Sequence, residues 1–369
     1  MNRLNDLRKN IDKIDIKLVD LFLKRMEYVN EIIEVKKEKD LPIYDALREK
    51  EIIKKHVDKI DDEYLKEITG KFFYEMMNLS KGYQYTLKNS ESETIKAEAV
   101  GHLGKEGSYS YLAAKKYFEN GDMISSNTFE EIFEGVSTNK LKYGVLPIEN
   151  TSTGSIILVY DLLKKYNLNI VGETTIEINH NLLVKKGVKL EDIKTVYSHP
   201  QALDQSNEFL KKYNWELINS ESTSESAYMV SVSERNDIAA IASMEAAKIY
   251  NLDVLKEYIN HNTKNITRFI IISKEICDNT NADKITLGFS VYHKPGALYS
   301  VLGIFDKNDI NMYKLESRPI IESPFEYYFY VDLEGNVEEL KVKNIIEEIK
   351  KSSTSFKIYG NYLRNCGGF

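Results

Sequence analysis

Apolar residues recur with a seven-residue period over the first part of the chain, from residue 4 to about residue 38. The positions of this heptad seam that are leucine, isoleucine or valine are Leu4, Leu7, Ile11, Ile14, Leu18, Leu21, Ile32 and Val35. Such spacing predicts one long amphipathic helix. At about 1.5 Å per residue it would be roughly 50 Å long, too long to bury its seam within a small domain of one chain. We therefore expect it to pair with a second copy of the chain.

Helical periodicity resumes twice after Pro42, which ends the first pattern. Asp45 is a favourable N-cap for a helix that begins at Ala46 and runs to about Ile60. Asp62 precedes a third helix, whose apolar stripe consists of Leu65, Ile68, Phe72, Met76, Leu79 and Tyr83. Residues 1–86 are therefore predicted to form an all-α domain. The polar residues 87–97, which have no periodicity, are interpreted as a linker.

From residue 98 to 275 the pattern changes to short apolar runs that alternate with helical stretches, which predicts an α/β fold with a largely parallel sheet. In its most informative stretch, residues 143–148 are strand-like and residues 149–154 form a hydroxyl-rich turn. A helix is expected to begin at Ser155, with a hydroxyl as its N-cap. A polar turn that leads into a helix N-terminus suits a carboxylate or phosphate ligand, although it is equally compatible with an ordinary β–α turn.

Polar turns of this kind recur at five strand ends. They are GSYS at 107–110, PIENTSTG at 147–154, SHPQ at 198–201, STS at 222–224 and TRF at 267–269. Hydroxyl and amide groups that gather at strand ends are expected where a ligand occupies the crevice of an α/β fold. His199, which precedes a proline, is interpreted as a fixed turn more readily than as a general acid.

The last part of the chain, residues 284–369, alternates in the order strand, helix, strand, strand, helix, strand. This order predicts an α+β domain of ferredoxin-like topology. The chain as a whole is therefore expected to be multidomain.

Composition narrows the choice of function. The formal net charge of −7 disfavours a nucleic-acid partner. Cys277 and Cys366 match no metal or redox spacing, no apolar run is long enough for a membrane span, and the start of the chain does not resemble a signal peptide. We thus expect a cytoplasmic protein without metal or cofactor. Only eight of the 50 basic residues are arginine. Because arginine is the side chain best suited to bind a carboxylate, its positions indicate candidate binding sites for carboxylates.

Several polar residues interrupt or flank the apolar stripes of the helical domain. The set comprises Arg8, Arg25, Lys36, Asp45, Arg48, Glu49, Ser80 and Gln84. Its spacing resembles the active-site pattern of the all-helical chorismate mutase family. That reaction moves no proton, so the protein must hold a dianion in a compact conformer and stabilise charge on the ether oxygen.

The resemblance implies a role for each member of this set. Arg25 and Arg8, the latter from the partner chain, would clamp the two carboxylates. Lys36 and Gln84 would donate to the ether oxygen, and Glu49, with Asp45 nearby, would take the ring hydroxyl. Arg48 and Ser80 would complete the wall.

The five turns together closely resemble the prephenate dehydratase family, in which two lobes of the periplasmic-binding-protein type close over prephenate. The resemblance makes Thr267 the donor to the departing ring hydroxyl. The residues it implies for substrate binding are Glu149, Asn150, Thr151, Ser198, Gln205, Ser222 and Arg268, although a structural ion pair is an equal alternative for Arg268. Lys105 departs from the family, which usually has proline after Gly104.

The C-terminal domain resembles an ACT domain of the phenylalanine-sensing kind. The residues that carry this resemblance, and that would bind phenylalanine, are Gly296, Ala297, Leu298, Glu316, Ser317, Arg318 and Pro319. A helix N-terminus would hold the carboxylate of the amino acid and a β-edge its amine. The alternative is a domain that serves dimerisation alone.

Taken together, these resemblances imply a bifunctional chorismate mutase and prephenate dehydratase that is inhibited by phenylalanine and forms at least a homodimer. Two alternatives stay open. One is a dehydratase whose helical domain survives only as a dimer clamp. The other is a two-lobed sensor that captures a small molecule without chemistry. Arogenate as a second substrate is also left open.

Overall fold

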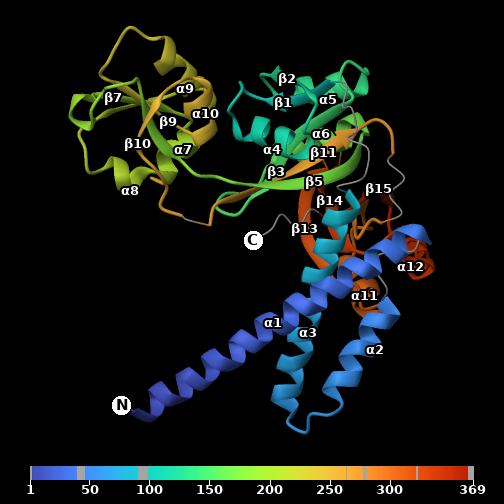
Figure 1. Ribbon diagram of the computed structural model, residues 1–369. Helices are drawn as coiled ribbons and strands as arrows, with labels where there is room; N and C mark the ends of the chain where they lie inside the picture. Colours follow the sequence, from blue (N-terminus) through green and yellow to red (C-terminus); the bar gives the residue numbers. More distant parts are fainter. Residues whose placement is uncertain are drawn as a thin grey trace. The chain divides into compact units, whose positions relative to one another are not determined.

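The computed structural model describes residues 2–39, 46–89, 99–262, 264–276, 281–320 and 323–364 (Figure 1). The chain divides into two compact units, Met1–Glu93 and Thr94–Phe369. Within the described ranges, no helix has both the length and the apolar character needed to cross a membrane.

The first unit consists of helices in its described residues, as predicted. They are α1 (Asn2–Glu38), α2 (Ala46–Val57) and α3 (Glu63–Asn89). Asp62 caps α3, because its Oδ1 accepts a hydrogen bond from the N–H of Leu65 at 2.9 Å. Helix α2 ends slightly earlier than the expected Ile60. Asp45, most of the expected linker and the last five residues of the chain lie outside the described residues.

Helix α1 carries apolar residues on more than one face. Val29 and Ile33 are buried, as is Met77 of α3. The predicted heptad seam lies elsewhere on α1, and the apolar residues that define it, from Leu4 to Val35, are 46–64% exposed in this single chain. The unit therefore buries one stripe of α1 and leaves the predicted seam uncovered.

Within the described part of the second unit, residues 99–276 form two α/β lobes (Figure 1). The sheet of lobe 1 has the strand order β2-β1-β3-β11-β5, with the short β4 paired to β3. Its strands are β1 (Ala99–Leu103), β2 (Asp122–Ser126), β3 (Tyr143–Asn150), β4 (Gly154–Ser155), β5 (Asn169–Glu177) and β11 (Ile266–Ser273). Its helices are α4 (Tyr109–Tyr117), α5 (Phe129–Ser137) and α6 (Ile157–Tyr166).

Lobe 2 has the strand order β10-β6-β9-β7-β8. Its strands are β6 (Asn181–Val184), β7 (Thr195–Ser198), β8 (Glu216–Asn219), β9 (Ile238–Ala242) and β10 (Asp253–Lys256). Its helices are α7 (Pro200–Gln205), α8 (Asn207–Leu210), α9 (Thr223–Val232), α10 (Met244–Ile249) and the short 3₁₀ helix Leu190–Asp192. The chain enters lobe 2 between β5 and β6 and returns between β10 and β11. The two-lobed α/β architecture predicted from the sequence is therefore present, but the expected largely parallel sheet was a wrong prediction. Both sheets are mixed, because β5 and β11 in lobe 1, and β6 and β10 in lobe 2, pair antiparallel with their neighbours.

The remaining strands and helices form a separate antiparallel sheet with the order β13-β14-β12-β15. The elements are β12 (Lys284–Ser290), α11 (Ala297–Lys307), β13 (Met312–Ile320), β14 (Ser323–Glu334), α12 (Leu340–Ser352) and β15 (Ser355–Tyr362). This is the expected ferredoxin-like topology. One face of the sheet packs on α11 and α12. From the other face, Tyr328, Tyr330, Tyr359 and Tyr362 join the core of lobe 1.

The segment after the 149–154 turn differs from the prediction. Helix α6 begins at Ile157, and its N-cap, Ile156, makes no side-chain capping bond. Ser155 instead belongs to β4, where it pairs with Glu149. The turn is thus a β-hairpin, and a hydroxyl-capped helix beginning at Ser155 was a wrong prediction. The reason is tertiary, because β13 engages the Ser155 hydroxyl.

Candidate active sites

Two antiparallel strands of lobe 1 bring the PIENTSTG and TRF motifs together. In the register of β3 and β11, Asn150 lies opposite Thr267, and Glu149 lies opposite Arg268. Successive side chains on a strand point to opposite faces of the sheet. Asn150 and Thr267 therefore face one side, whereas Glu149 and Arg268 face the other.

On the first side, Asn150 Nδ2 donates to Thr267 Oγ1 at 2.8 Å and to Asn265 Oδ1 at 2.7 Å. All three side chains are buried. Asn150 Oδ1 accepts the backbone N–H groups of Ser152 at 2.9 Å and Thr153 at 3.1 Å. The same amide thus shapes the hairpin turn and contacts the threonine hydroxyl.

The hydrogen bonds continue from lobe 1 into lobe 2. Asn265 Nδ2 donates to Gln205 Oε1 at 3.0 Å, and His180 Nε2 lies 2.9 Å from the same oxygen. The Tyr109 hydroxyl is 3.2 Å from His180 Nδ1 and donates to the carbonyl of Asn179 at 2.6 Å. Burial lowers the pKa of His180 to about 4, so this network is neutral near pH 7.

Gln205 leaves a hydrogen-bond donor unused in this network. Its side chain is 5% exposed, and its Nε2 has no hydrogen-bond partner among the described residues. A buried unsatisfied donor is costly, so a ligand acceptor at this point would be stabilised. The structure therefore brings together Asn150, Gln205 and Thr267 of the predicted set.

Sequence reasoning missed Tyr109, His180 and Asn265 as members of the site. His180 lies in none of the five polar turns and shows no metal-ligand spacing, so no motif indicated it. Position along the chain could have indicated two of them. His180 lies where the chain enters lobe 2, and Asn265 lies where it returns to lobe 1. Residues at such crossovers lie between the lobes, where a two-lobed fold holds its ligand.

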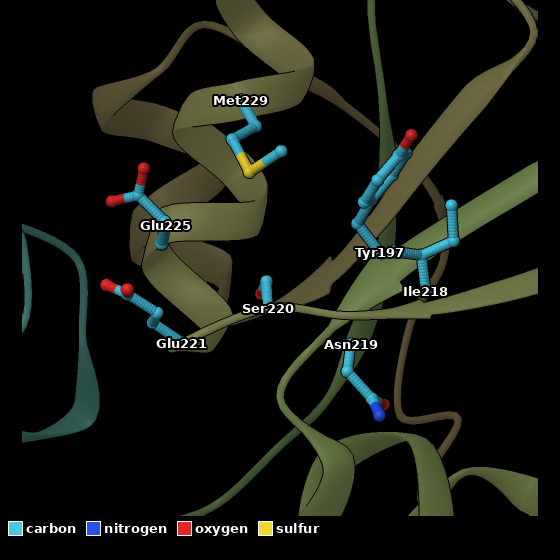
Figure 2. A pocket seen from close by; sticks show the side chains of 7 residues that line it. All are labelled: Tyr197, Ile218, Asn219, Ser220, Glu221, Glu225 and Met229. Atoms are coloured by element: carbon cyan, nitrogen blue, oxygen red, sulfur yellow. The ribbon is translucent and has the colours of Figure 1, made fainter.

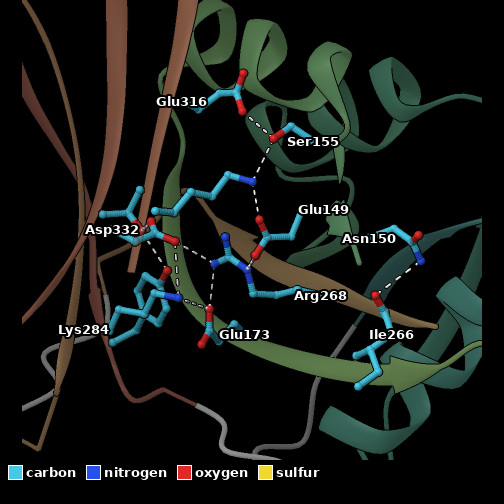
Figure 3. Close-up of polar contacts among 12 residues, drawn as sticks. Glu149, Asn150, Ser155, Glu173, Ile266, Arg268, Lys284, Glu316 and Asp332 are labelled. Atoms are coloured by element: carbon cyan, nitrogen blue, oxygen red, sulfur yellow. Dashed lines mark hydrogen bonds and ion pairs between the residues drawn. The ribbon is translucent and has the colours of Figure 1, made fainter. Parts of the chain in front are cut away.

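The opposite face of β3 and β11 carries a buried ion cluster that also includes β5 and the C-terminal sheet (Figure 3). Arg268 Nε donates to Glu149 Oε1 at 2.6 Å, and its Nη1 lies 2.9 Å from Glu173 and 2.8 Å from Asp332. Lys284 Nζ is 2.8 Å from Glu173 and 3.3 Å from Asp332.

The charges of this cluster satisfy one another. Burial raises the pKa of Asp332, but Arg268 and Lys284 outweigh it and hold that pKa below its ordinary value. Burial likewise acts against the Arg268 cation, yet the Asp332 and Glu173 carboxylates raise its pKa. Glu149 and Arg268 are therefore structural ion partners here. For Arg268 this is the structural alternative named from the sequence, and a contact of Glu149 or Arg268 with substrate stays a prediction that the structure does not test.

The hydroxyls of Thr151, Ser198 and Ser222 bind backbone groups in this structure. Thr151 Oγ1 donates to the carbonyl of Lys264 at 2.9 Å, and Ser198 Oγ donates to that of Ile241 at 2.7 Å. Ser222 caps α9 by accepting the N–H of Glu225 at 3.0 Å. These hydroxyls fix the local backbone, and a contact of any of the three with substrate stays a prediction. His199 similarly caps α7.

Lys105, which departs from the family pattern, contacts the opposite lobe. Its Nζ lies 3.5 Å from Glu225 Oε2 and 4.3 Å from the ring centre of Tyr228, both on α9. Close by, Ser243 Oγ donates to the carbonyl of Gly107 at 2.7 Å. The turn before α4 therefore joins the lobes, and the lysine adds an ion pair to this contact.

A hollow of about 280 Å³ lies within lobe 2, apart from this network (Figure 2). Its lining residues are Tyr197, Ile218, Asn219, Ser220, Glu221, Glu225 and Met229. None of the network residues lines it, and the carboxylates of Glu221 and Glu225 would repel an anionic ligand. Among the residues that the structure describes, no group of three or more His, Cys, Asp or Glu side chains is placed to hold a metal ion.

The helical unit brings together part of the second predicted set. Arg25 of α1 donates to the hydroxyl of Ser80 on α3, and Ser80 Oγ lies 2.8 Å from the carbonyl oxygen of Met76. Burial lowers the pKa of Arg25. Gln84, one turn beyond Ser80, is buried, and its Oε1 has no hydrogen-bond partner in the described part of the chain.

The other members of this set are more exposed, or lie outside the residues that the structure describes. Arg8 is exposed and Lys36 is half-buried. Arg48 pairs with Glu51 at 3.4 Å on the surface of α2. Asp45 and the side chain of Glu49 lie outside the described residues, so the expected group of Asp45, Arg48 and Glu49 is not tested by the structure.

The segment proposed to sense phenylalanine also contacts lobe 1. On β13, the side chain of Glu316 accepts from the Ser155 hydroxyl, and Arg318 donates to both oxygens of Asp161 at 3.0 Å. Glu316 and Arg318 thus contact the dehydratase region, and their role in an amino acid site stays a prediction. Gly296, with φ of +76°, precedes the N-terminus of α11.

Comparisons with known proteins agree with this division. Residues 7–85 match the chorismate mutase type II family, and residues 100–277 match the prephenate dehydratase family. The bifunctional chorismate mutase/prephenate dehydratase of Buchnera aphidicola subsp. Acyrthosiphon pisum is 36% identical, over 98% of this chain and 96% of that protein. Its counterpart in Escherichia coli is 33% identical over the same shares.

Among solved structures, the prephenate dehydratase of Arthrobacter aurescens in complex with L-Phe superposes with a TM-score of 0.66 and 26% identity, covering 72% of this chain and 90% of that one. The curated relatives match across nearly the whole chain, and the two family matches cover separate, successive parts of it. This chain therefore belongs to the family of bifunctional chorismate mutase/prephenate dehydratases.

Proposed function

We propose that the chain rearranges chorismate to prephenate in its helical unit and converts prephenate to phenylpyruvate between its α/β lobes. As a member of this family it is an enzyme with both activities. The observation that carries the second assignment is the buried hydrogen bond from Asn150 Nδ2 to Thr267 Oγ1 at 2.8 Å. It lies in a neutral network that spans both lobes.

Thr267 assists departure of the ring hydroxyl. Its Oγ1 accepts from Asn150, so its own proton is directed to another acceptor, which we assign as the leaving oxygen. Threonine is a weak acid, and its contribution is a hydrogen bond that strengthens as negative charge develops on that oxygen. The electrons of the breaking bond to the carboxylate complete the aromatic ring as carbon dioxide leaves. A solvent proton converts the expelled hydroxide to water.

Neutral amides hold the substrate in this pocket. The unused Nε2–H of Gln205 provides a donor for an oxygen of prephenate, and Asn265 and His180 hold the other end of that amide. Preorganised donors in a site that excludes water stabilise charge more strongly than the same donors in water. Asn150 and Gln205 are accordingly assigned as binding residues, and His180 as the residue that orients Gln205.

The mutase assignment rests on orientation and charge, because the rearrangement requires no proton transfer. Arg25, beside Ser80, binds one carboxylate of chorismate, and Arg8 of a second copy of the chain binds the other. Lys36 and Gln84 donate to the ether oxygen. Glu49 and Asp45 take the ring hydroxyl, and Arg48 completes the wall.

Phenylalanine is proposed as a feedback inhibitor that binds at Gly296, Ala297 and Leu298, with Ser317 and Pro319 of β13. The A. aurescens prephenate dehydratase was solved with L-Phe. Its structure matches 72% of this chain, whereas the dehydratase region, residues 100–277, makes up less than half of it, so the match extends beyond that region. The N–H groups at the start of α11 suit the carboxylate. Inhibition then follows from tighter binding of phenylalanine to an inhibited arrangement.

The proposed organisation is a mutase domain over residues 1–86, a dehydratase domain over 98–275 and an ACT domain over 284–369. A homodimer is supported by the exposed seam of α1. We place the enzyme in the cytoplasm. Neither of the two reactions requires a cofactor.

The test supplies chorismate, and separately prephenate, to the purified full-length chain and follows prephenate and phenylpyruvate with and without phenylalanine. Formation of both products supports the proposal. If phenylpyruvate forms from prephenate but chorismate is not converted, the helical unit serves only as a dimer clamp. Binding of prephenate without phenylpyruvate would indicate a sensor, and arogenate as substrate is tested in the same assay.

A further inference from the structure

The hairpin that places Asn150 is short and depends on support from outside its own lobe. Strand β4 consists of Gly154 and Ser155, which pair with Asn150 and Glu149 of β3. The residues between the two strands are exposed, and Gly154 has φ of +81°. A ladder of two residue pairs is weak by itself. Pairing with β11 holds Asn150 from one side, so on the other side the position of its amide depends on what holds the two flanks of the hairpin, Glu149 and Ser155.

One lysine of the C-terminal sheet contacts both flanks. Lys314 Nζ, on β13, pairs with Glu149 Oε2 and donates to Ser155 Oγ at 2.8 Å. The Lys314 side chain is 13% exposed. Burial acts to raise the pKa of Glu149, but the charges of Arg268 and Lys314 hold it below its ordinary value. The carboxylate is thus an anion that binds β11 through one oxygen and β13 through the other.

We propose that Lys314 is a positioning residue of the dehydratase site, an inference that rests on the function proposed above. Acting through Glu149 and Ser155, it fixes the hairpin whose Asn150 amide contacts Thr267. Lys314, Glu316 and Arg318 alternate along β13, so all three side chains face lobe 1. The strand that carries the proposed phenylalanine segment therefore also holds the catalytic hairpin.

The interface offers a matched control. Arg318 and Asp161 form a second ion pair between β13 and lobe 1, and Asp161 lies on α6 outside the hairpin. Lys314→Met removes the cation but keeps an apolar stem of similar length. Asp161→Asn weakens the same interface without removing a contact of Glu149 or Ser155. The comparison separates positioning of the hairpin from general docking of the C-terminal sheet.

In the full-length enzyme, Lys314→Met is expected to lower dehydratase kcat at least about tenfold, because a misplacement of about 1 Å at a catalytic group can cost about 10²-fold. Mutase turnover by the same sample should be unchanged. Lys314→Arg, which restores the cation, should recover kcat to within about threefold of wild type, and Asp161→Asn should stay within about twofold. If Lys314→Met does not fold, Ser155→Ala replaces it, with an expected loss of about threefold or more.

The proposal is overturned if Lys314→Met, or the folded Ser155→Ala chain, retains wild-type dehydratase kcat. It is overturned equally if Asp161→Asn loses as much activity as Lys314→Met, because the effect would then be general docking. A double variant, Lys314→Met with Glu149→Gln, should be less impaired than the product of the single effects. A wild-type chain that forms no phenylpyruvate would instead refute the proposed function, so the two failures are distinguishable.

Discussion

Asn150 and Thr267 meet across two antiparallel strands at 2.8 Å, and their immediate neighbours Glu149 and Arg268 meet on the reverse face at 2.6 Å. The same two strand ends therefore carry a neutral site on one side and a buried ion pair on the other. The pair holds the register of β3 and β11, and the register brings the amide to the hydroxyl. The ends of β3 and β11 therefore position the catalytic groups on one face and attach the C-terminal sheet on the other.

Replacement of Thr267 by alanine is expected to lower dehydratase kcat by about 10² to 10⁴, the range typical of a lost catalytic hydrogen-bond donor or acid. Thr267→Ser keeps a hydroxyl and should retain most of the activity. Mutase turnover by the same protein serves as the internal control for folding. Phenylpyruvate formation at a near wild-type rate by Thr267→Ala would remove this residue from the mechanism.

The buried ion cluster should be costly to break. Lys284→Met leaves the carboxylates of Asp332 and Glu173 with one cation fewer, and loss of one partner from a buried pair costs about 3 to 5 kcal/mol. Lys343→Met, which removes an exposed pair with Glu338, should cost less than about 1 kcal/mol. Denaturant unfolding of both variants measures the difference. Equal stabilities would show that removing a cation from the buried cluster costs no more than breaking an exposed pair.

The sequence was sufficient for the elements of this fold whose pattern is local. Heptads, alternating strands and the βαββαβ order predicted the helical unit, the lobes and the ferredoxin-like sheet, although some helices begin or end a few residues from their expected positions. The motifs also indicated Asn150, Gln205 and Thr267, which the structure joins through Asn265. Each of these inferences needed only neighbours in sequence or a motif read as a unit.

The failures have a common cause in contacts between distant segments. The family resemblance implied pocket roles for Glu149 and Arg268 as well as for Asn150 and Thr267, but strand alternation places the first two on the other face, where they form an ion pair. Ser155 was assigned as a helix cap, but its hydroxyl is held by β13, about 160 residues further along the chain. No periodicity within the turn could have indicated that partner.

Acid should destabilise the dehydratase region through its buried histidines. Burial lowers the pKa of His180 to about 4 and also lowers that of His102, whereas an unfolded histidine titrates near 6.5. Between these values the unfolded chain binds protons that the folded chain does not, so the free energy of unfolding falls as pH drops from 6.5 towards 4. His180 should contribute about 2 kcal/mol of this loss by pH 5.

The single tryptophan, Trp215, packs with the core of lobe 2 and reports its unfolding by fluorescence. Denaturant midpoints measured from pH 7.5 to about 4.5 should decrease through the stated window. His180→Gln should show a shallower decrease, because one of the groups that titrates only after unfolding is gone. A decrease as steep as in wild type would mean that other groups cause the acid sensitivity.

The exposed seam of α1 makes the mutase dependent on a second chain. Ile14 lies in the seam and is 56% exposed, whereas Ile16 is 64% exposed on the same helix but outside the seam. Ile14→Asp places a charge where two copies of α1 are proposed to meet, so it should separate them and withdraw Arg8 from the site of the other chain. Loss of one carboxylate clamp should lower mutase kcat/KM by about 10² or more, and α1 amides should exchange faster with solvent.

Ile16→Asp adds the same charge to the same helix. It should leave both the mutase kcat/KM and the exchange of the α1 amides near their wild-type values. Dehydratase turnover, which depends on the other unit, should be unchanged in either variant. Equal loss of mutase activity in Ile14→Asp and Ile16→Asp would trace the effect to helix stability. Full mutase activity in Ile14→Asp would instead mean that a single chain holds both carboxylates of chorismate, and the role assigned to Arg8 would pass to a cation of the same unit.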